Sequence, residues 1–157
     1  MTGHEDWIVC LAATPDGSLL ASGDRKGILR LWNLPAGTPR ATIDTGGGMV
    51  RCLEVAPGGS VLAAGGQDGR VRFYALPSAE FLAEVDATEA GTEGVVDLAF
   101  DPGGTRLATA CNRGLMKWDF AAERLGTIFG RTSSSGEESS PGVDVEGTLK
   151  AAISALS

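Results

Sequence analysis

The feature that most constrains the fold of this chain is a turn segment, rich in proline and glycine, that occurs three times. The three copies are residues 14–17 (TPDG), 56–59 (APGG) and 101–104 (DPGG), so the period is about 42 to 45 residues. Self-similarity at this spacing is typical of architectures in which each repeat is one small unit that packs against its neighbours. The chain is therefore expected to contain three similar units.

Each turn is followed by an apolar run, a second turn rich in glycine, and a further run that a large aromatic residue closes. The first runs are LLASG from Leu19, VLAAGG from Val61 and RLATAC from Arg106. The second runs are ILRLWNL from Ile28, VRFYAL from Val71 and LMKWDF from Leu115. The alignment places Trp32, Tyr74 and Trp118 at equivalent positions, which favours a packing role for them over a stacking surface for bases or sugars.

Two further segments complete each unit. The proline turns are preceded by WIVCLAA from Trp7, MVRCLEV from Met49 and GVVDLAF from Gly94. The aromatic residues are followed by more polar segments, PRATID from Pro39, AEFLAEV from Ala79 and RLGTIF from Arg124. Short runs that are enriched in β-branched and aromatic residues and bounded by turns indicate strands. We therefore expect an all-β chain built from three four-stranded units.

The sequence resembles the WD-repeat family through Gly3-His4, Pro15-Asp16-Gly17, Leu20-Ala21-Ser22-Gly23 and Trp118-Asp119. The resemblance covers roughly residues 3 to 130 and implies a β-propeller fold. The expected fold is a propeller fragment with three four-stranded blades and the remnant of a fourth.

The repeats are expected at about residues 3–44, 45–86 and 87–130 of a region that spans 1–130. Residues 131–148 are rich in Ser, Gly and Glu, a composition that favours a flexible loop. Residues 149–157 fit either the first strand of a fourth repeat or a short helix. Three blades leave two apolar faces bare, so we expect a piece of a longer propeller, a truncated gene product or a protomer that self-associates to complete a ring.

In the WD-repeat family a His, a Ser or Thr, an Asp and the Trp form a hydrogen-bonded network that braces a blade. The structural residues that the resemblance implies here are His4, Ser22, Trp32, Asp68, Tyr74, Thr109 and Trp118. The first repeat has Lys26 where the aspartate is expected, and the second keeps Asp68 but has Ala64 and Tyr74 at the other positions. The third has no histidine, and residues 112–113 (NR) occupy its aspartate turn. No repeat is thus expected to hold a complete network.

Composition and motifs argue against most chemical functions. The net charge of −7 disfavours binding to nucleic acid or to an anionic membrane surface, because phosphate groups repel an acidic chain. No leader or membrane-spanning segment is evident, which favours the cytoplasm. Three cysteines without a CxxC spacing indicate free thiols, and one histidine without a catalytic motif indicates a protein that is not an enzyme and uses no metal or cofactor.

The resemblance implies that function resides in recognition of other proteins by loops at one rim of the propeller. In the family, the loops before the first strand and between the second and third strands share a rim. The candidate protein-binding residues there are Trp7, Arg25, Lys26, Met49, Gln67, Asn112 and Arg113, near Glu5 and Asp6. Trp7 is the first choice for an anchor, and the alternative is that it packs inside its own blade.

The expected function is a non-catalytic protein–protein interaction scaffold. One alternative is an accessory propeller of a larger enzyme, such as a kinase or hydrolase, whose catalytic part lies outside this sequence. Another is a self-assembling ring that binds a small ligand. The complete reading frame would identify the former, and a stable, defined oligomer would identify the latter.

Overall fold

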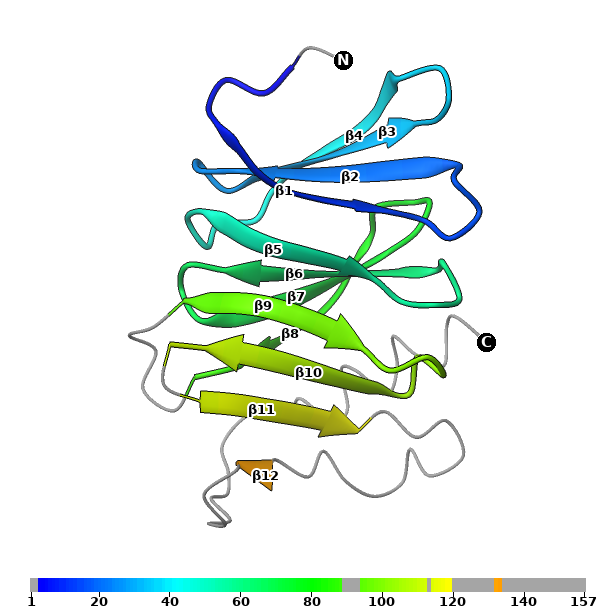
Figure 1. The fold of residues 1–157 in the computed structure, drawn as a ribbon. Coiled ribbons are helices and arrows are strands. Elements are labelled where there is room, and N and C mark those ends of the chain that lie inside the picture. Colours follow the sequence, from blue (N-terminus) through cyan, green and yellow to red (C-terminus); the bar gives the residue numbers. More distant parts are fainter. Residues whose placement is uncertain (1–2, 89–93, 113, 120–131, 134–157) are drawn as a thin grey trace.

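The computed structural model describes residues 3–88, 94–112, 114–119 and 132–133. These residues form three four-stranded antiparallel sheets, which Figure 1 shows stacked one on the next. The expected all-β architecture of three four-stranded blades is therefore confirmed, whereas the expected remnant of a fourth blade lies outside the described residues. No helix long and apolar enough to cross a membrane occurs in the described ranges.

Each blade is a meander in which consecutive strands are neighbours. The first blade contains β1 (Ile8–Ala13), β2 (Leu19–Asp24), β3 (Ile28–Asn33) and β4 (Thr38–Asp44). The second contains β5 (Val50–Val55), β6 (Val61–Gly66), β7 (Arg70–Ala75) and β8 (Phe81–Asp86). The third contains β9 (Val95–Phe100), β10 (Arg106–Cys111), β11 (Gly114–Asp119) and β12 (Thr132–Ser133).

The fourth strand of the third blade differs from the expectation. Met116 and Lys117 of β11 pair with Ser133 and Thr132, so the two-residue β12 lies inside the segment that was expected to be a flexible loop. The segment from Arg124 that was expected to form this strand lies outside the described residues, as do residues 134–157.

The repeated turn segments contain glycine because their backbone adopts positive φ angles. Gly17, Gly59 and Gly104 hold φ angles of 70°, 76° and 66°, which side chains with a Cβ rarely adopt. In the first turn the Asp16 carboxylate also accepts hydrogen bonds from the Ser18 backbone N–H and the Thr14 hydroxyl. The turn chemistry thus fixes where the first strand of each blade ends and the second begins.

The strand register confirms that the three aromatic residues are equivalent. Trp32 lies opposite Leu20 in the β2–β3 pair, and Tyr74 lies opposite Leu62 in the β6–β7 pair. The backbone of Trp118 lies opposite Leu107 in the β10–β11 pair. Each aromatic position is therefore set by the same hairpin geometry.

Apolar side chains between the sheets hold the blades together. One buried cluster joins β3 of the first blade to β5 and β6 of the second and includes Leu29, Leu31 and Leu62. A second cluster joins the second and third blades and includes Val71 and Val95. The second blade is thus covered on both faces, a situation that favours nearly continuous apolar strands.

Glycine on the second strand of a blade allows the next blade to approach closely. A Cβ added to Gly23 would lie 2.6 Å from Cγ1 of Val50, and a Cβ added to Gly65 would lie 2.8 Å from Cγ1 of Val95. The Sγ of Cys10 lies 3.3 Å from the carbonyl oxygen of Val50 at the first of these contacts. The first strands β1, β5 and β9 consequently lie side by side in this order, and the loops that precede β1 and β5 lie at the left edge of Figure 1.

Candidate protein-interaction rim

The loops at this edge have the same construction in the first two blades. The backbone N–H of Arg25 in the β2–β3 turn donates to the carbonyl of Trp7, which precedes β1, at 3.1 Å. The backbone N–H of Gln67 in the β6–β7 turn donates to the carbonyl of Met49, which precedes β5, at 2.9 Å. We call residues 3–7, 25–27, 45–51 and 67–69, which are the loops at this edge and the first two residues of β5, the rim. These bonds make Trp7 and Met49 equivalent residues of adjacent blades.

The Trp7 side chain lies in solvent at the rim, where 75% of its surface is exposed. Its backbone N–H donates to Oδ1 of Asp6 at 2.7 Å, and the guanidinium of Arg25 lies 5.7 Å from the centroid of its ring. The alternative that Trp7 packs inside its own blade is therefore wrong. An exposed aromatic ring on a hydrogen-bonded loop, with a cation over one face, is a candidate anchor for a partner.

The other predicted rim residues occupy different environments. Lys26 lies 3.9 Å from the carboxylate of Glu5, but both side chains are largely exposed, so this ion pair contributes little to stability. Gln67 and Asn112 are exposed and Met49 is half-buried. Arg113 lies outside the described residues. The structure brings together the residues of the first two blades at one edge.

Sequence reasoning missed Arg51, which follows Met49 at the second position of β5. A Cβ added to Gly94, which precedes β9, would lie 3.0 Å from Nε of Arg51, so this side chain reaches the start of the third blade. Arg51 was overlooked because it falls within a run predicted as a strand, and only loop residues were considered for binding. Its half-buried position next to Met49 adds a cation to the rim.

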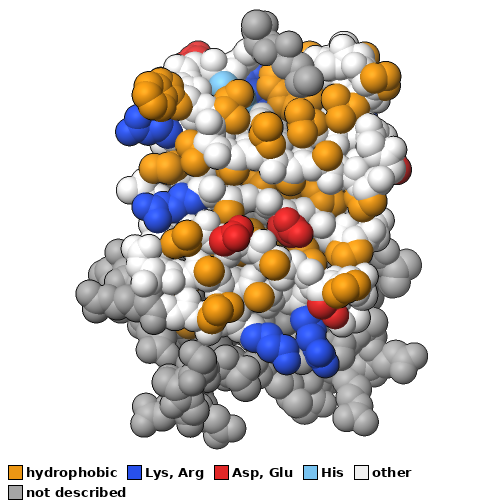
Figure 2. Space-filling model, in the orientation of Figure 1, with side chains coloured by type: hydrophobic (Ala, Val, Ile, Leu, Met, Phe, Trp, Pro, Cys, Tyr) orange, Lys and Arg blue, Asp and Glu red, His pale blue; other side chains and the backbone are white. Residues whose placement is uncertain are grey.

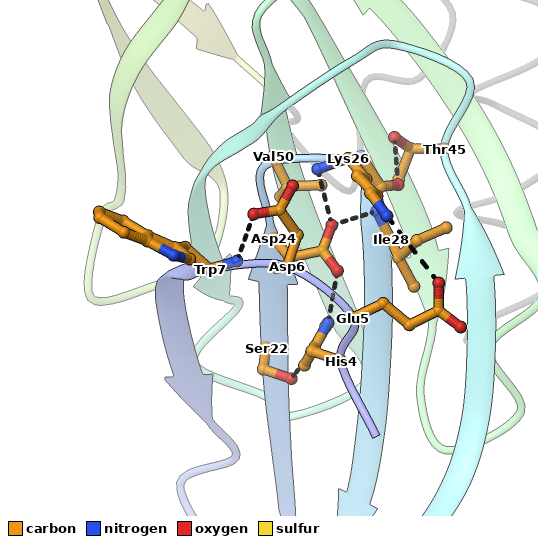
Figure 3. Close-up of polar contacts among 12 residues, drawn as sticks. His4, Glu5, Asp6, Trp7, Ser22, Asp24, Lys26, Ile28, Thr45 and Val50 are labelled. Atoms are coloured by element: carbon orange, nitrogen blue, oxygen red, sulfur yellow. Dashed lines mark hydrogen bonds and ion pairs between the residues drawn. The ribbon is translucent and has the colours of Figure 1, made fainter. Parts of the chain in front are cut away.

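A buried polar network supports the rim in the first blade. Nδ1 of His4 lies 2.7 Å from Oδ2 of Asp24, and Nε2 of His4 lies 2.6 Å from Oγ of Ser22 (Figure 3). The indole N–H of Trp32 donates to the same Ser22 oxygen at 2.8 Å. A neutral His4 that carries its proton on Nδ1 satisfies every group, because Ser22 can then donate to Nε2 while it accepts from Trp32. The network of His, Ser, Asp and Trp is complete.

The expectation that the first repeat lacks its aspartate is therefore wrong. The aspartate is Asp24, at the end of β2 and not at the Lys26 position in the following turn. Ser22 and Asp24 project to the same face because side chains alternate along a strand. Burial acts to raise the pKa of Asp24, but hydrogen bonds from the backbone N–H groups of Ile28 and Lys26 and from His4 outweigh it and lower the pKa.

The second blade lacks this network and uses ion pairs in its place. Gly66 occupies the position of Asp24, since each lies opposite the first residue of its neighbouring strand. Asp68 lies two residues further on, so its predicted role as the network aspartate is wrong. It pairs with Arg72 at 2.6 Å, and Arg72 in turn lies 3.2 Å from the carboxylate of Glu84 on β8. The Arg72 side chain is largely buried, and these carboxylates neutralise it.

The remaining structural residues lie where the alignment placed them. Tyr74 is buried and packs edge-on against Phe81, with ring centroids 5.9 Å apart. Thr109 is fully buried at the position of Ser22, and Cys111 occupies the position of Asp24. The Trp118 side chain lies outside the described part of the chain. Within the described ranges, no group of three or more His, Cys, Asp or Glu residues could hold a metal ion.

Comparisons with known proteins agree with this architecture. The family model described as "WD domain, G-beta repeat" matches residues 1–33, 37–74 and 83–119, which is more than half of the chain. The small ribosomal subunit proteins RACK1 of Medicago sativa and Glycine max are each 39% identical to this chain over 46 residues. That stretch covers 29% of this chain and 14% of each relative, so the match spans a small part of their length.

A solved structure shares the fold over a longer stretch. The crystal structure of the RRP9 WD40 repeats superposes with a TM-score of 0.71 and 24% sequence identity. The superposition covers 78% of this chain and 38% of that one, so this chain spans well under half of the neighbour. With three matched repeats and three blades of the expected register, this chain belongs to the WD40 repeat family.

Proposed function

We propose that this chain is a non-catalytic protein-interaction scaffold that binds its partner at the rim. WD40 repeat domains are generally interaction scaffolds. The observation that carries the proposal is the exposed Trp7 ring, which is held at a hydrogen-bonded loop under the Arg25 guanidinium. Tryptophan and arginine are the residues most enriched among those that dominate interface energies.

The rim is suited to recognition because a rigid scaffold presents it. The network of His4, Ser22, Asp24 and Trp32 lies directly beneath the loop that holds Trp7, and Asp24 also accepts the backbone N–H of Lys26 at 2.9 Å. A preformed loop loses little conformational entropy on binding, so more of the contact energy appears as affinity.

Site-specific photocrosslinking tests the proposal. A benzophenone amino acid is placed at position 7, 49 or 81 of the full chain in its native cell, and cross-linked proteins are identified by mass spectrometry. Phe81 is the matched control, because it is an exposed aromatic residue on the outer strand β8. We expect the same partner at positions 7 and 49 and not at position 81.

The affinity of the identified partner then provides the decisive measurement. Trp7→Ala should weaken binding at least about thirtyfold, the loss expected for an interface residue worth about 2 kcal/mol, and Phe81→Ala should leave it unchanged. A partner that cross-links at position 81 alone, or an affinity that Trp7→Ala does not alter, would refute the rim as the binding surface.

We also propose that the outer face of the first blade self-associates. Ile8 and Leu11 of β1 are exposed, whereas the equivalent residues of β5, Val50 and Leu53, are buried by the first blade. An apolar face of this kind favours association. Light scattering on the purified chain should show a molar mass that rises with concentration, and a constant monomeric mass would contradict this second proposal.

A further inference from the structure

The rim holds two arginines, Arg25 and Arg51, that no carboxylate of the described residues neutralises. The chain has 20 acidic and 13 basic residues, yet neither Arg25 nor Arg51 forms an ion pair within the described ranges. The ion pair of Lys26 with the exposed Glu5 is long, at 3.9 Å. Elsewhere in the second blade, Arg70 and Arg72 are paired with carboxylates. Within the same ranges, Arg30 on β3 and Arg40 on β4 also form no ion pair, but Arg30 lies over the Trp32 ring and Arg40 hydrogen-bonds to Pro77 and Asn33. Arg25 and Arg51 are the arginines without a described carboxylate partner at the surface that also exposes Trp7.

These cations follow the rim from the first blade to the third. Arg25 lies in the β2–β3 turn against the Trp7 ring, and Arg51 extends from β5 to the start of β9. Met49 lies in the same loop region as Arg51 and is the counterpart of Trp7. Figure 2 shows basic side chains along this edge, next to apolar ones. The arrangement alternates an apolar and a cationic group in each of two adjacent blades.

We infer that the rim binds an acidic peptide segment in which an Asp or Glu stands beside an apolar side chain. This inference rests on the proposed function and specifies the partner chemistry. The apolar side chain covers the Trp7 ring, and the carboxylate is bound by the guanidinium of Arg25 or Arg51. A guanidinium can donate two parallel hydrogen bonds to one carboxylate, which makes arginine better suited to this task than lysine.

The overall charge of −7 does not prevent this recognition. The Debye length at physiological ionic strength is about 8 Å, so a peptide carboxylate at the rim responds mainly to the charges of the rim itself. Of the acidic residues there, Glu5 faces Lys26 and Asp68 is paired with Arg72, whereas Arg25 and Arg51 have no carboxylate partner among the residues that the structure describes. Single-stranded nucleic acid is the competing ligand with negative charge and flat apolar groups. It requires a groove of many phosphate contacts, and two arginines at the rim are too few to provide one.

Selection from a random library tests the inference. Random 12-residue peptides displayed on phage are selected on the immobilised full chain, and clones that lose binding to Trp7→Ala are sequenced. We expect these clones to be enriched in Asp or Glu next to Leu or Phe. The affinities of the corresponding synthetic peptides, and of a fluorescein-labelled U12 oligonucleotide, are then measured by fluorescence anisotropy at 0.15 M and 0.5 M salt.

Charge variants show whether the arginines make the contact. Arg25→Gln and Arg51→Gln should each weaken binding of an acidic peptide about fivefold, as expected for loss of one exposed charge-assisted contact. Arg40→Gln is the matched control, since Arg40 is an exposed arginine on the outer strand β4 and should have no effect. Higher salt should weaken binding to the wild type more than to either rim variant.

The outcomes separate this inference from the proposed function. Clones that depend on Trp7 but are neutral or basic would overturn the acidic partner and leave the rim as a protein-binding surface. Tighter binding of U12 than of any peptide would replace a peptide partner by a nucleic acid. A selection in which no clone depends on Trp7 would count against both.

Discussion

Substitution Ser22→Ala should destabilise the chain strongly although it removes a single oxygen atom. Ser22 is buried on β2, and its hydroxyl joins two side chains, the indole N–H of Trp32 at 2.8 Å and Nε2 of His4 at 2.6 Å. Truncation leaves both groups without this partner in a site from which water is largely excluded. Each unsatisfied buried polar group costs about 1–3 kcal/mol, so the free energy of unfolding should fall by about 2–6 kcal/mol.

Urea denaturation of the full chain, followed by circular dichroism, measures this change. Ser60→Ala is the matched control, because Ser60 lies in the turn of the second blade, at the position of Ser18 in the first, and its side chain makes no hydrogen bond within the described ranges. This substitution should change the free energy of unfolding by no more than about 0.5 kcal/mol. The double variant His4→Ala with Ser22→Ala should lose less than the sum of the two single losses, since both act on one network. An effect of Ser22→Ala no larger than that of Ser60→Ala would refute the bracing role.

Three further predictions concern packing, acid stability and thiol chemistry. Gly65→Ala should destabilise by about 1–3 kcal/mol in urea denaturation, because the new Cβ would lie 2.8 Å from a methyl group of the next blade. Gly114→Ala should be nearly neutral, because no atom of the described residues lies within 4 Å of its added Cβ. Equal effects of the two substitutions would contradict the close approach of blades. Because the pKa of Asp24 is lowered in the folded state, its ionised form contributes stability that is full above about pH 4 and is lost as pH falls through the folded-state pKa. Urea midpoints between pH 2 and 6 should therefore vary less for Asp24→Asn than for the wild type. Parallel pH profiles of the two proteins would refute this. Burial raises the pKa of Cys52 to about 12, so iodoacetamide at pH 8 should alkylate this thiol far more slowly in the folded than in the urea-unfolded chain. Mass spectrometry measures the two rates, and equal rates would exclude a buried thiol.

The blade architecture could be predicted from the sequence because it depends on local signals with a fixed spacing. The three turn segments, with their glycines at positive φ, set the period, and the short apolar runs between turns indicate strands. The equivalence of Trp32 and Tyr74 followed from counting residues within each hairpin, and the register confirms it. These features require no knowledge of which side chains meet across the blade.

The polar network could not be predicted in the same way, because it depends on side-chain direction. Counting along the family pattern placed the aspartate of the first repeat at Lys26, whereas alternation along β2 directs Asp24 to the face of Ser22 and His4. Asp68 matched the pattern by sequence position, but Arg72, which no motif includes, captures its carboxylate. Ion pairs between positions outside a motif become visible only when the strands are placed in register.

The prediction that the loops before the first strand and between the second and third strands share an edge is confirmed for the first two blades, but the side chains at this edge were only partly predicted. Whether Trp7 packs or is exposed depends on the tertiary path of the loop before β1, and the sequence left both alternatives open. Arg51 was missed because alternation along a strand predicts only which face a side chain takes, and its reach towards Gly94 depends on how closely β5 and β9 approach. The sequence alone therefore could not indicate that unpaired cations accompany the aromatic ring.

Substitutions in the first blade test whether the exposed apolar residues of β1 form an association surface, as the equivalent residues of β5 form a contact between blades. Ile8 and Leu11 on β1 are 54% and 59% exposed, whereas the equivalent Val50 and Leu53 on β5 are 1% and 7% exposed because the first blade covers them. The double variant Ile8→Ser with Leu11→Ser should therefore lower the concentration-dependent molar mass in light scattering. It should leave the urea midpoint unchanged at concentrations where the wild type is monomeric. Val50→Ser is the matched control and should cost about 2–4 kcal/mol, because it buries a hydroxyl and opens space at a blade interface. A molar mass that the double variant does not alter would show that this face is not where the chain associates, and the same side-chain positions would then have different roles in the first and second blades.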